Sequence, residues 1–131
     1  MVFTMGLETD IEKREGFIHF SVEGVFKDSE INSELIDVFG KMVESVKQYD
    51  CFRVLLDTRE LDYEINVLER FKIGEYISKI WRKELIKIAC LRCDDKTDNF
   101  TETVATNRGS IFKFFNNEKE SIDWLKEWII F

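Results

Sequence analysis

Two runs of almost uninterrupted apolar residues set the strongest limit on how this chain can fold. They span residues 52–57 (FRVLLD) and 85–93 (LIKIACLRC). Strands that are apolar on both faces are typical of the centre of a parallel sheet, where helices cover each side. Parallel neighbours need a long crossover connection, usually a helix, and such crossovers are right-handed. We therefore predict that the two runs lie side by side and parallel in the middle of an α/β domain.

Apolar periodicity divides the rest of the chain into strands and helices. The predicted strands lie at 3–7, 18–22 and 111–115, and the predicted helices at 31–46, 68–81, 100–107 and from 118 to the C-terminus. The first two strands form an antiparallel hairpin through a charged turn at 12–16. Asp28 or Ser29 caps the first helix, Gly109 stops the third, and Asn116 or Asn117 caps the last. The order β-β-α-β-α-β-α-β-α predicts one domain over 1–131 with a mixed sheet and the hairpin near one edge.

The composition argues against several classes of function. Nineteen basic side chains against twenty-six acidic ones give a net charge of −7, which disfavours binding to nucleic acid or anionic membrane. The sequence has no apolar stretch of about 20 residues, as a membrane span requires, and no basic segment of a signal peptide at its start. Three cysteines do not make a disulfide framework. We expect a cytoplasmic protein.

The reactive side chains do not form a catalytic or metal-binding motif. Cys90 and Cys93 form a C-x-x-C, but in a strand they point to opposite faces, so one ion could not bind both. We interpret these cysteines, and Cys51, as small buried hydrophobes. His19 shares a strand face with Ser21 at a spacing of roughly 6.5–7 Å, beyond hydrogen-bond reach, and is expected to be a half-exposed strand residue. We expect no enzyme activity, no metal and no cofactor.

Cations cluster at the end of the predicted second helix and on the strand that follows it. The helix end carries Lys79, Arg82 and Lys83, and the strand carries Lys87 and Arg92. Cations near a helix C-terminus offset the helix dipole, so we favour this structural role over a binding patch.

Polar residues follow the predicted strands at their carboxyl ends, where open α/β sheets bind ligands. The candidate ligand or partner rim consists of Ser29, Asp57, Thr58, Arg59, Asp94 and Asn116. The alternative is structural: Asp57 and Arg59 pair with each other, and Asp94 caps a helix.

The C-terminal helix carries more apolar residues than one buried face needs. Trp124, Trp128 and Phe131 form a second stripe beside the stripe that faces the sheet. Either these aromatics close the core, or they form an exposed patch for association, including a homodimer, or for contact with an apolar ligand.

The chain resembles the STAS superfamily, and within it the stand-alone SpoIIAA-like branch, which is related in fold to Sec14-type lipid carriers. The resemblance rests on the strand order and on residues 55–57 (LLD), 100–105 (FTETVA), 114–115 (FF) and 122–125 (IDWL). It implies a SpoIIAA-like mixed sheet. It also implies either binding of a partner protein, switched by phosphorylation of a serine at the start of the second helix, or binding of a small ligand.

The sequence departs from the family at the phosphorylation motif. Counted from Asp57, the motif falls at 65–68, which reads INVL and has no hydroxyl group. The expected function is therefore a non-enzymatic binding or regulatory module that acts on an unidentified protein without this switch. The alternative is a carrier or sensor of a small, partly apolar, lipid-like ligand.

Overall fold

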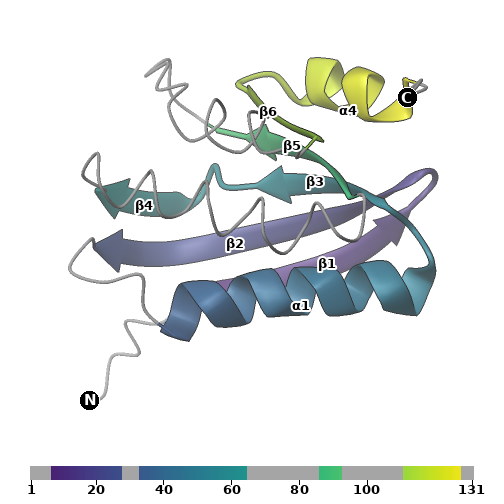
Figure 1. Ribbon diagram of the computed structural model, residues 1–131. Helices are drawn as coiled ribbons and strands as arrows, with labels where there is room; N and C mark the ends of the chain where they lie inside the picture. The colour runs from purple at the N-terminus through teal and green to yellow at the C-terminus, as the bar shows by residue number, and fades with distance from the viewer. Residues whose placement is uncertain (1–6, 28–32, 65–85, 93–110, 128–131) are drawn as a thin grey trace.

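The computed structural model describes residues 7–27, 33–64, 86–92 and 111–127 (Figure 1). Its elements are β1 (Glu8–Arg14), β2 (Phe17–Lys27), α1 (Ser33–Tyr49), β3 (Arg53–Asp57), β4 (Leu61–Glu64), β5 (Lys87–Leu91), β6 (Ile111–Phe115) and α4 (Glu118–Lys126). The predicted helices at 68–81 and 100–107, and the caps Asp28, Ser29 and Gly109, lie outside the described residues.

The main sheet has the strand order β1-β2-β3-β5-β6. β1 pairs antiparallel with β2, and all the other pairs are parallel. The two apolar strands β3 and β5 are neighbours, with Leu55 opposite Ala89, so the predicted parallel centre is confirmed. β4 pairs with the far end of β2, beyond the part of β2 that pairs with β3 (Figure 1).

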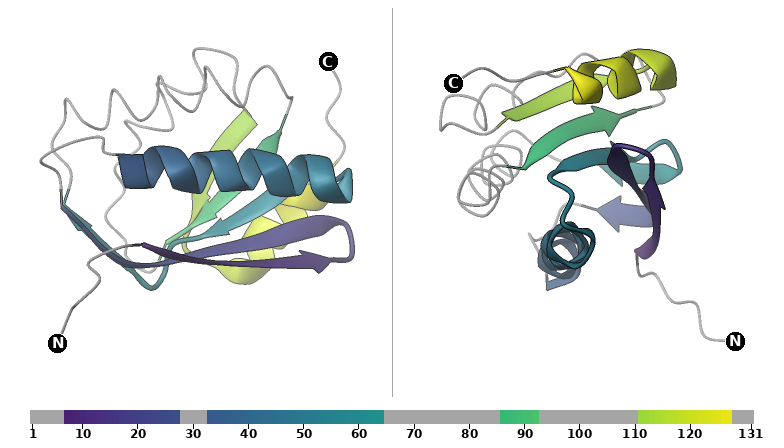
Figure 2. Two further views of the ribbon diagram at one scale, coloured as in Figure 1. Left: turned by 90° about the horizontal axis from the view of Figure 1, so that it is seen from below. Right: turned by 90° about the vertical axis from the view of Figure 1, so that its right-hand side faces the viewer.

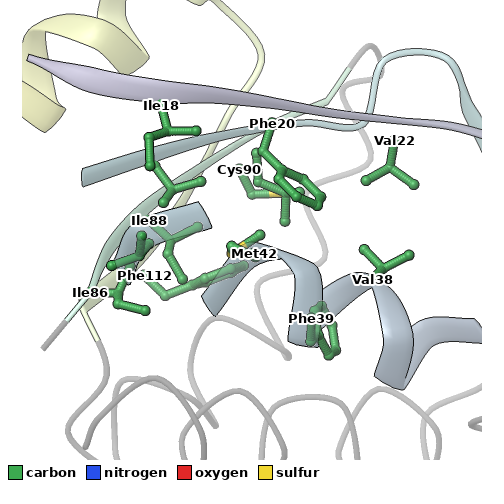
Figure 3. Close-up of a cluster of buried hydrophobic side chains, with 13 residues drawn as sticks. Ile18, Phe20, Val22, Val38, Phe39, Met42, Ile86, Ile88, Cys90 and Phe112 are labelled. Carbon is green, nitrogen blue, oxygen red and sulfur yellow. The ribbon is translucent and has the colours of Figure 1, made fainter. Parts of the chain in front are cut away.

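Of the described helices, α1 packs on one face of the sheet and α4 on the other (Figure 2). On the α1 face, side chains such as Phe20, Met42 and Ile88 form the larger core and are almost completely buried (Figure 3). On the opposite face, Leu125 of α4 packs against Leu55 and Leu91. Alternate residues of each central strand therefore enter different cores, which explains why β3 and β5 are apolar throughout.

The hairpin is confirmed, but the strand that pairs with β2 follows the predicted segment 3–7, of which residues 3–6 lie outside the described residues. β1 runs from Glu8 to Arg14, and Glu15 and Gly16 make the turn. Gly16 has φ +88°, a conformation that glycine adopts without steric cost. The charged residues 12–14, predicted as part of the turn, instead belong to β1. Glu12 pairs with His19 and Arg14 with Phe17, and the two charged side chains remain exposed to solvent.

The boundaries of the two central strands also differ from the predictions. Phe52 is 42% exposed and precedes β3, and β5 ends at Leu91. β4 was not predicted, because four residues with a single polar alternation carry too weak a strand signal.

The last helix is capped at both ends. The Asn117 side chain accepts a hydrogen bond from the Glu120 amide at 2.9 Å, which confirms one of the two predicted caps. The helix ends at Lys126 rather than at the C-terminus, since Glu127 has extended backbone angles. There the Lys87 ammonium group donates to the carbonyls of Trp124 and Glu127.

Within the described residues, no helix combines the length and the hydropathy that crossing a bilayer requires.

Candidate functional site

On the α4 side of the sheet, no described helix packs extensively over the β1–β2 hairpin beyond Phe17, which belongs to the α4 core cluster. α4 lies over β3, β5 and β6, to one side of the β1–β2 hairpin (Figure 2). The hairpin register places Glu8 opposite Glu23, Asp10 opposite Ser21 and Glu12 opposite His19, so these six side chains share one face. Four of them are exposed carboxylates, which we call the acidic face: Glu8, Asp10, Glu12 and Glu23. Arg14 pairs with Glu12 at 3.4 Å.

Carboxylates lie close together at the end of this face where Glu8 pairs with Glu23. Hydrogen bonding and charge repulsion from Glu8 raise the pKa of the exposed Glu23 carboxyl, and Glu60 and Asp10 add to the repulsion. Removing a proton from Glu23 is unfavourable because negative charge is already concentrated there. A cation that approached this end of the face would relieve the repulsion.

A polar network borders the acidic face where β2 meets β3. The Asp57 carboxylate accepts hydrogen bonds from the Arg59 amide at 3.1 Å, Arg59 Nε at 3.0 Å and Arg59 Nη2 at 2.7 Å. His19 Nε2 lies 2.9 Å from the Oδ2 atom of Asp57. Arg59 Nη2 also donates to Glu118 Oε1 at 3.1 Å, which links the end of β3 to the first turn of α4.

The network fixes the charge of Asp57. Burial alone would raise its pKa, but hydrogen bonds from Arg59 and His19 outweigh the burial and lower the pKa of Asp57 to about 2. The same pairing raises the pKa of Arg59, so both partners stay ionised. The Asp57 side chain is 10% exposed and that of Arg59 is 41% exposed. Asp57 is therefore a fixed anion that positions Arg59, which remains partly accessible.

His19 differs from its predicted role. Its side chain is 13% exposed, and its Nε2 atom lies 3.4 Å from the Ser21 hydroxyl, so the predicted separation of the pair is wrong. The ring leans toward Asp57 on the neighbouring strand, whose carboxylate accepts a hydrogen bond from Nε2. Since Asp57 and Ser21 both contact the same ring nitrogen, the three residues cannot relay a proton as a Ser-His-Asp triad does.

A shallow cavity of about 320 Å³ opens beside the network. Ser21, Glu23, Asp57, Arg59 and Glu60 supply its polar lining. The cavity could not be predicted from the sequence, because the cavity depends on the parallel register that sets Ser21 opposite Asp57.

The four predicted rim residues that the structure describes do not form one group. Asp57 and Arg59 lie together and pair with each other, as the structural alternative predicted. Thr58 faces the other way: its amide and its hydroxyl both donate to the Leu91 carbonyl, and it contacts Cys90. Asn116 is exposed just before α4, and Ser29 and Asp94 lie outside the described residues.

The aromatic patch and the cysteines are described in part. Trp124 is half-buried, 5.5 Å from the Phe115 ring between centroids, in the position of a residue that closes the core. Trp128, Phe131 and Cys93 lie outside the described residues. Cys90 is buried, as predicted, whereas Cys51 is partly exposed.

The described residues contain no group of three or more His, Cys, Asp or Glu arranged to hold a metal ion.

Comparison with known proteins identifies the fold. No protein-family model matches the chain, and no curated protein matches it. An uncharacterized protein with a SpoIIAA-like fold from Shewanella loihica has 16% sequence identity and a TM-score of 0.56, over 95% of this chain and 98% of that one. An anti-sigma factor antagonist from Mycobacterium paratuberculosis has 11% identity and a TM-score of 0.59, over 97% and 100%. The chain has a SpoIIAA-like fold.

Proposed function

We propose that this protein is a non-enzymatic binding module that docks a partner protein through the acidic face and Arg59. The observation that carries the proposal is the face of the hairpin that no described helix covers, where four exposed carboxylates lie beside a cavity and a fixed guanidinium group. The partner presents a basic surface, because complementary charge steers association and favours the correct partner.

The chemistry of the network argues for binding rather than catalysis. The Asp57 carboxylate already accepts four hydrogen bonds and is a poor proton acceptor at neutral pH. The His19 nitrogen nearest Ser21 is occupied by Asp57, so it does not activate the hydroxyl. These groups hold one another in place, which suits a rigid docking surface.

The structural neighbours are consistent with this function. One of them is named an anti-sigma factor antagonist, a protein that acts by opposing another protein. A binding role needs no phosphorylated serine at 65–68, where this sequence has no hydroxyl group. Docking through charged residues on the hairpin would give this chain its own specificity on the shared fold.

The carrier alternative needs an apolar cavity under the helices. Between α1 and the sheet, the described side chains are closely packed, with Phe20, Met42 and Val46 fully buried. The cavity found among the described residues is lined largely by charged side chains. This packing favours the protein-binding function, and the carrier function stays a prediction.

The experiment is a quantitative capture from a lysate of cells that make the protein. The triple variant Glu8→Lys/Asp10→Lys/Glu23→Lys reverses the acidic face, and Asp37→Lys/Glu44→Lys reverses two exposed carboxylates of α1 as a matched control. We expect the native chain and the α1 variant to enrich the same partner. The amount of this partner captured by the acidic-face variant should be at least about tenfold lower.

The capture must also respond to salt. We expect recovery of the partner to fall as the salt concentration rises, because exposed charge pairs are screened. Equal capture by the native chain and the acidic-face variant, or a loss only in the α1 variant, would contradict the proposal. Capture of no saturable partner by the native chain would contradict it as well.

A further inference from the structure

Arg92 is a buried cation with an unusual environment. It follows β5 directly, and its amide donates to the Phe115 carbonyl at 2.8 Å. Its side chain lies on the α1 face, where the guanidinium carbon is 3.8 Å from the centre of the Phe114 ring. The residue is only 8% exposed, and its Nε atom is buried without a hydrogen-bond partner.

The positive charge of Arg92 has no counter-ion within the described residues. Arginine keeps its charge at any pH a protein meets, so it cannot respond to burial by losing a proton. Buried charges are normally paired, because an isolated one is costly. Arg59 shows the usual solution, since it pairs with Asp57 and Glu118 while remaining far more exposed.

The Phe114 ring does not remove the need for an anion. A ring stabilises a cation through its face by a modest amount, whereas the donors of a guanidinium group point outward in its plane. A bound water could accept a hydrogen bond from Nε but would leave the charge uncompensated. An oxyanion would do both, because the planar donors of arginine match the oxygens of carboxylate and phosphate.

We propose that Arg92 binds a small oxyanion, either a phosphate or a carboxylate group, at the carboxyl end of β5. This end of a parallel sheet is where open α/β folds bind ligands. The burial of Arg92 limits the ligand to a small molecule, since a protein surface could not reach the side chain. The site lies on the α1 face, opposite the acidic face, so it is a separate function from partner docking.

The binding test follows the Nε–H signal of Arg92 by NMR in ¹⁵N-labelled full-length protein, with the signal assigned by its loss in Arg92→Lys. The native protein is titrated with sodium phosphate, with sodium acetate and with sodium chloride at equal ionic strength. We expect a saturable shift with phosphate, with acetate or with both, and none with chloride. The anion that saturates identifies the ligand class.

Two lysine variants define the role of the side chain. Arg92→Lys keeps the charge but loses the planar donors, so binding followed at the Phe115 amide should weaken at least about tenfold. Arg53→Lys, at the opposite end of the sheet, should bind as the native protein does. No saturable shift, an equal response to chloride, or unchanged affinity in Arg92→Lys would overturn the proposal.

A stability measurement separates a ligand site from an internal ion pair. In buffer without oxyanions, Arg92→Met removes an uncompensated charge and keeps apolar contact with Phe114, so we expect Tm to stay the same or rise. A fall in Tm of about 10 °C or more would show that the chain itself supplies the counter-ion, which would overturn the proposal.

Discussion

Asp57 accepts four hydrogen bonds at the centre of the candidate site. Its buried carboxylate receives donors from its own loop, through Arg59, and from the neighbouring strand, through His19. Removing the carboxylate would leave the Arg59 guanidinium group with its contact to Glu118 alone and would remove the acceptor of the His19 ring. Asp57 therefore contributes to stability while it orients Arg59 for binding.

This dual role predicts a pH-dependent cost for Asp57→Asn. The pKa of Asp57 is lowered in the folded protein to about 2, so its contribution is complete above pH 4 and is lost as the pH falls through about 2. At pH 7 the variant should lose about 2 kcal/mol of unfolding free energy. Urea unfolding between pH 3 and pH 7 should show the difference from the native protein shrinking toward acid.

An exposed aspartate provides the control for this measurement. Asp123 is 62% exposed and pairs with Lys119 on the surface of α4, so Asp123→Asn should cost less than about 1 kcal/mol. A pH-independent difference for Asp57→Asn, or an equal cost for both variants, would contradict the role assigned to Asp57.

Only the local part of this network could be predicted from the sequence. The pairing of Asp57 with Arg59 spans two residues and could be predicted from the sequence. The contacts with His19 and Glu118 span 38 and 59 residues, and they depend on the strand register and on where α4 docks. Long-range geometry of this kind has no signal in periodicity.

At the scale of elements, α4 is held by contacts at both of its ends. Asn117 caps the first turn, and Glu118 contacts Arg59. At the other end, Lys87 lies under the last turn and donates to two carbonyls, with its ammonium group 4.4 Å from the Trp124 ring centre. Burial lowers the pKa of Lys87, and these carbonyls provide its hydrogen bonds.

Lys87→Met should therefore loosen the end of α4. The substitution leaves two carbonyls without a donor, so we expect a loss of about 1–3 kcal/mol in unfolding free energy and faster amide hydrogen exchange in residues 124–127. Lys126→Met is the control, because Lys126 is an exposed cation of the same turn. An equal effect of both substitutions would show that helix-dipole charge, rather than the two hydrogen bonds, explains the result.

The elements themselves were predictable to different degrees. The uninterrupted apolar character of β3 and β5 identified the parallel centre, because both faces of these strands are buried. The strand Glu8–Arg14 was not predicted because most of its residues are charged or polar and hide the apolar alternation. Its backbone pairing with β2 holds it in the sheet. Lys87 was expected on a strand beside cations that offset the dipole of the second helix, and its contact with the end of α4 was not predicted.

At the scale of the whole molecule, the two sheet faces divide the proposed functions. On the α4 side, the face of the hairpin that no described helix covers presents carboxylates in a protein that carries a net charge of −7. The opposite face holds the main core and the buried Arg92. A partner protein and a small anion could therefore bind without competing for the same surface.

Zero-length carbodiimide cross-linking tests the docking proposal most directly, because it joins carboxylates to lysine amines that are in contact. The native protein is cross-linked in the lysate, and the joined peptides are identified by mass spectrometry. We predict that the partner's lysines are joined to Glu8, Asp10, Glu12 or Glu23. Cross-links confined to Asp37 and Glu44 of α1 would contradict the account.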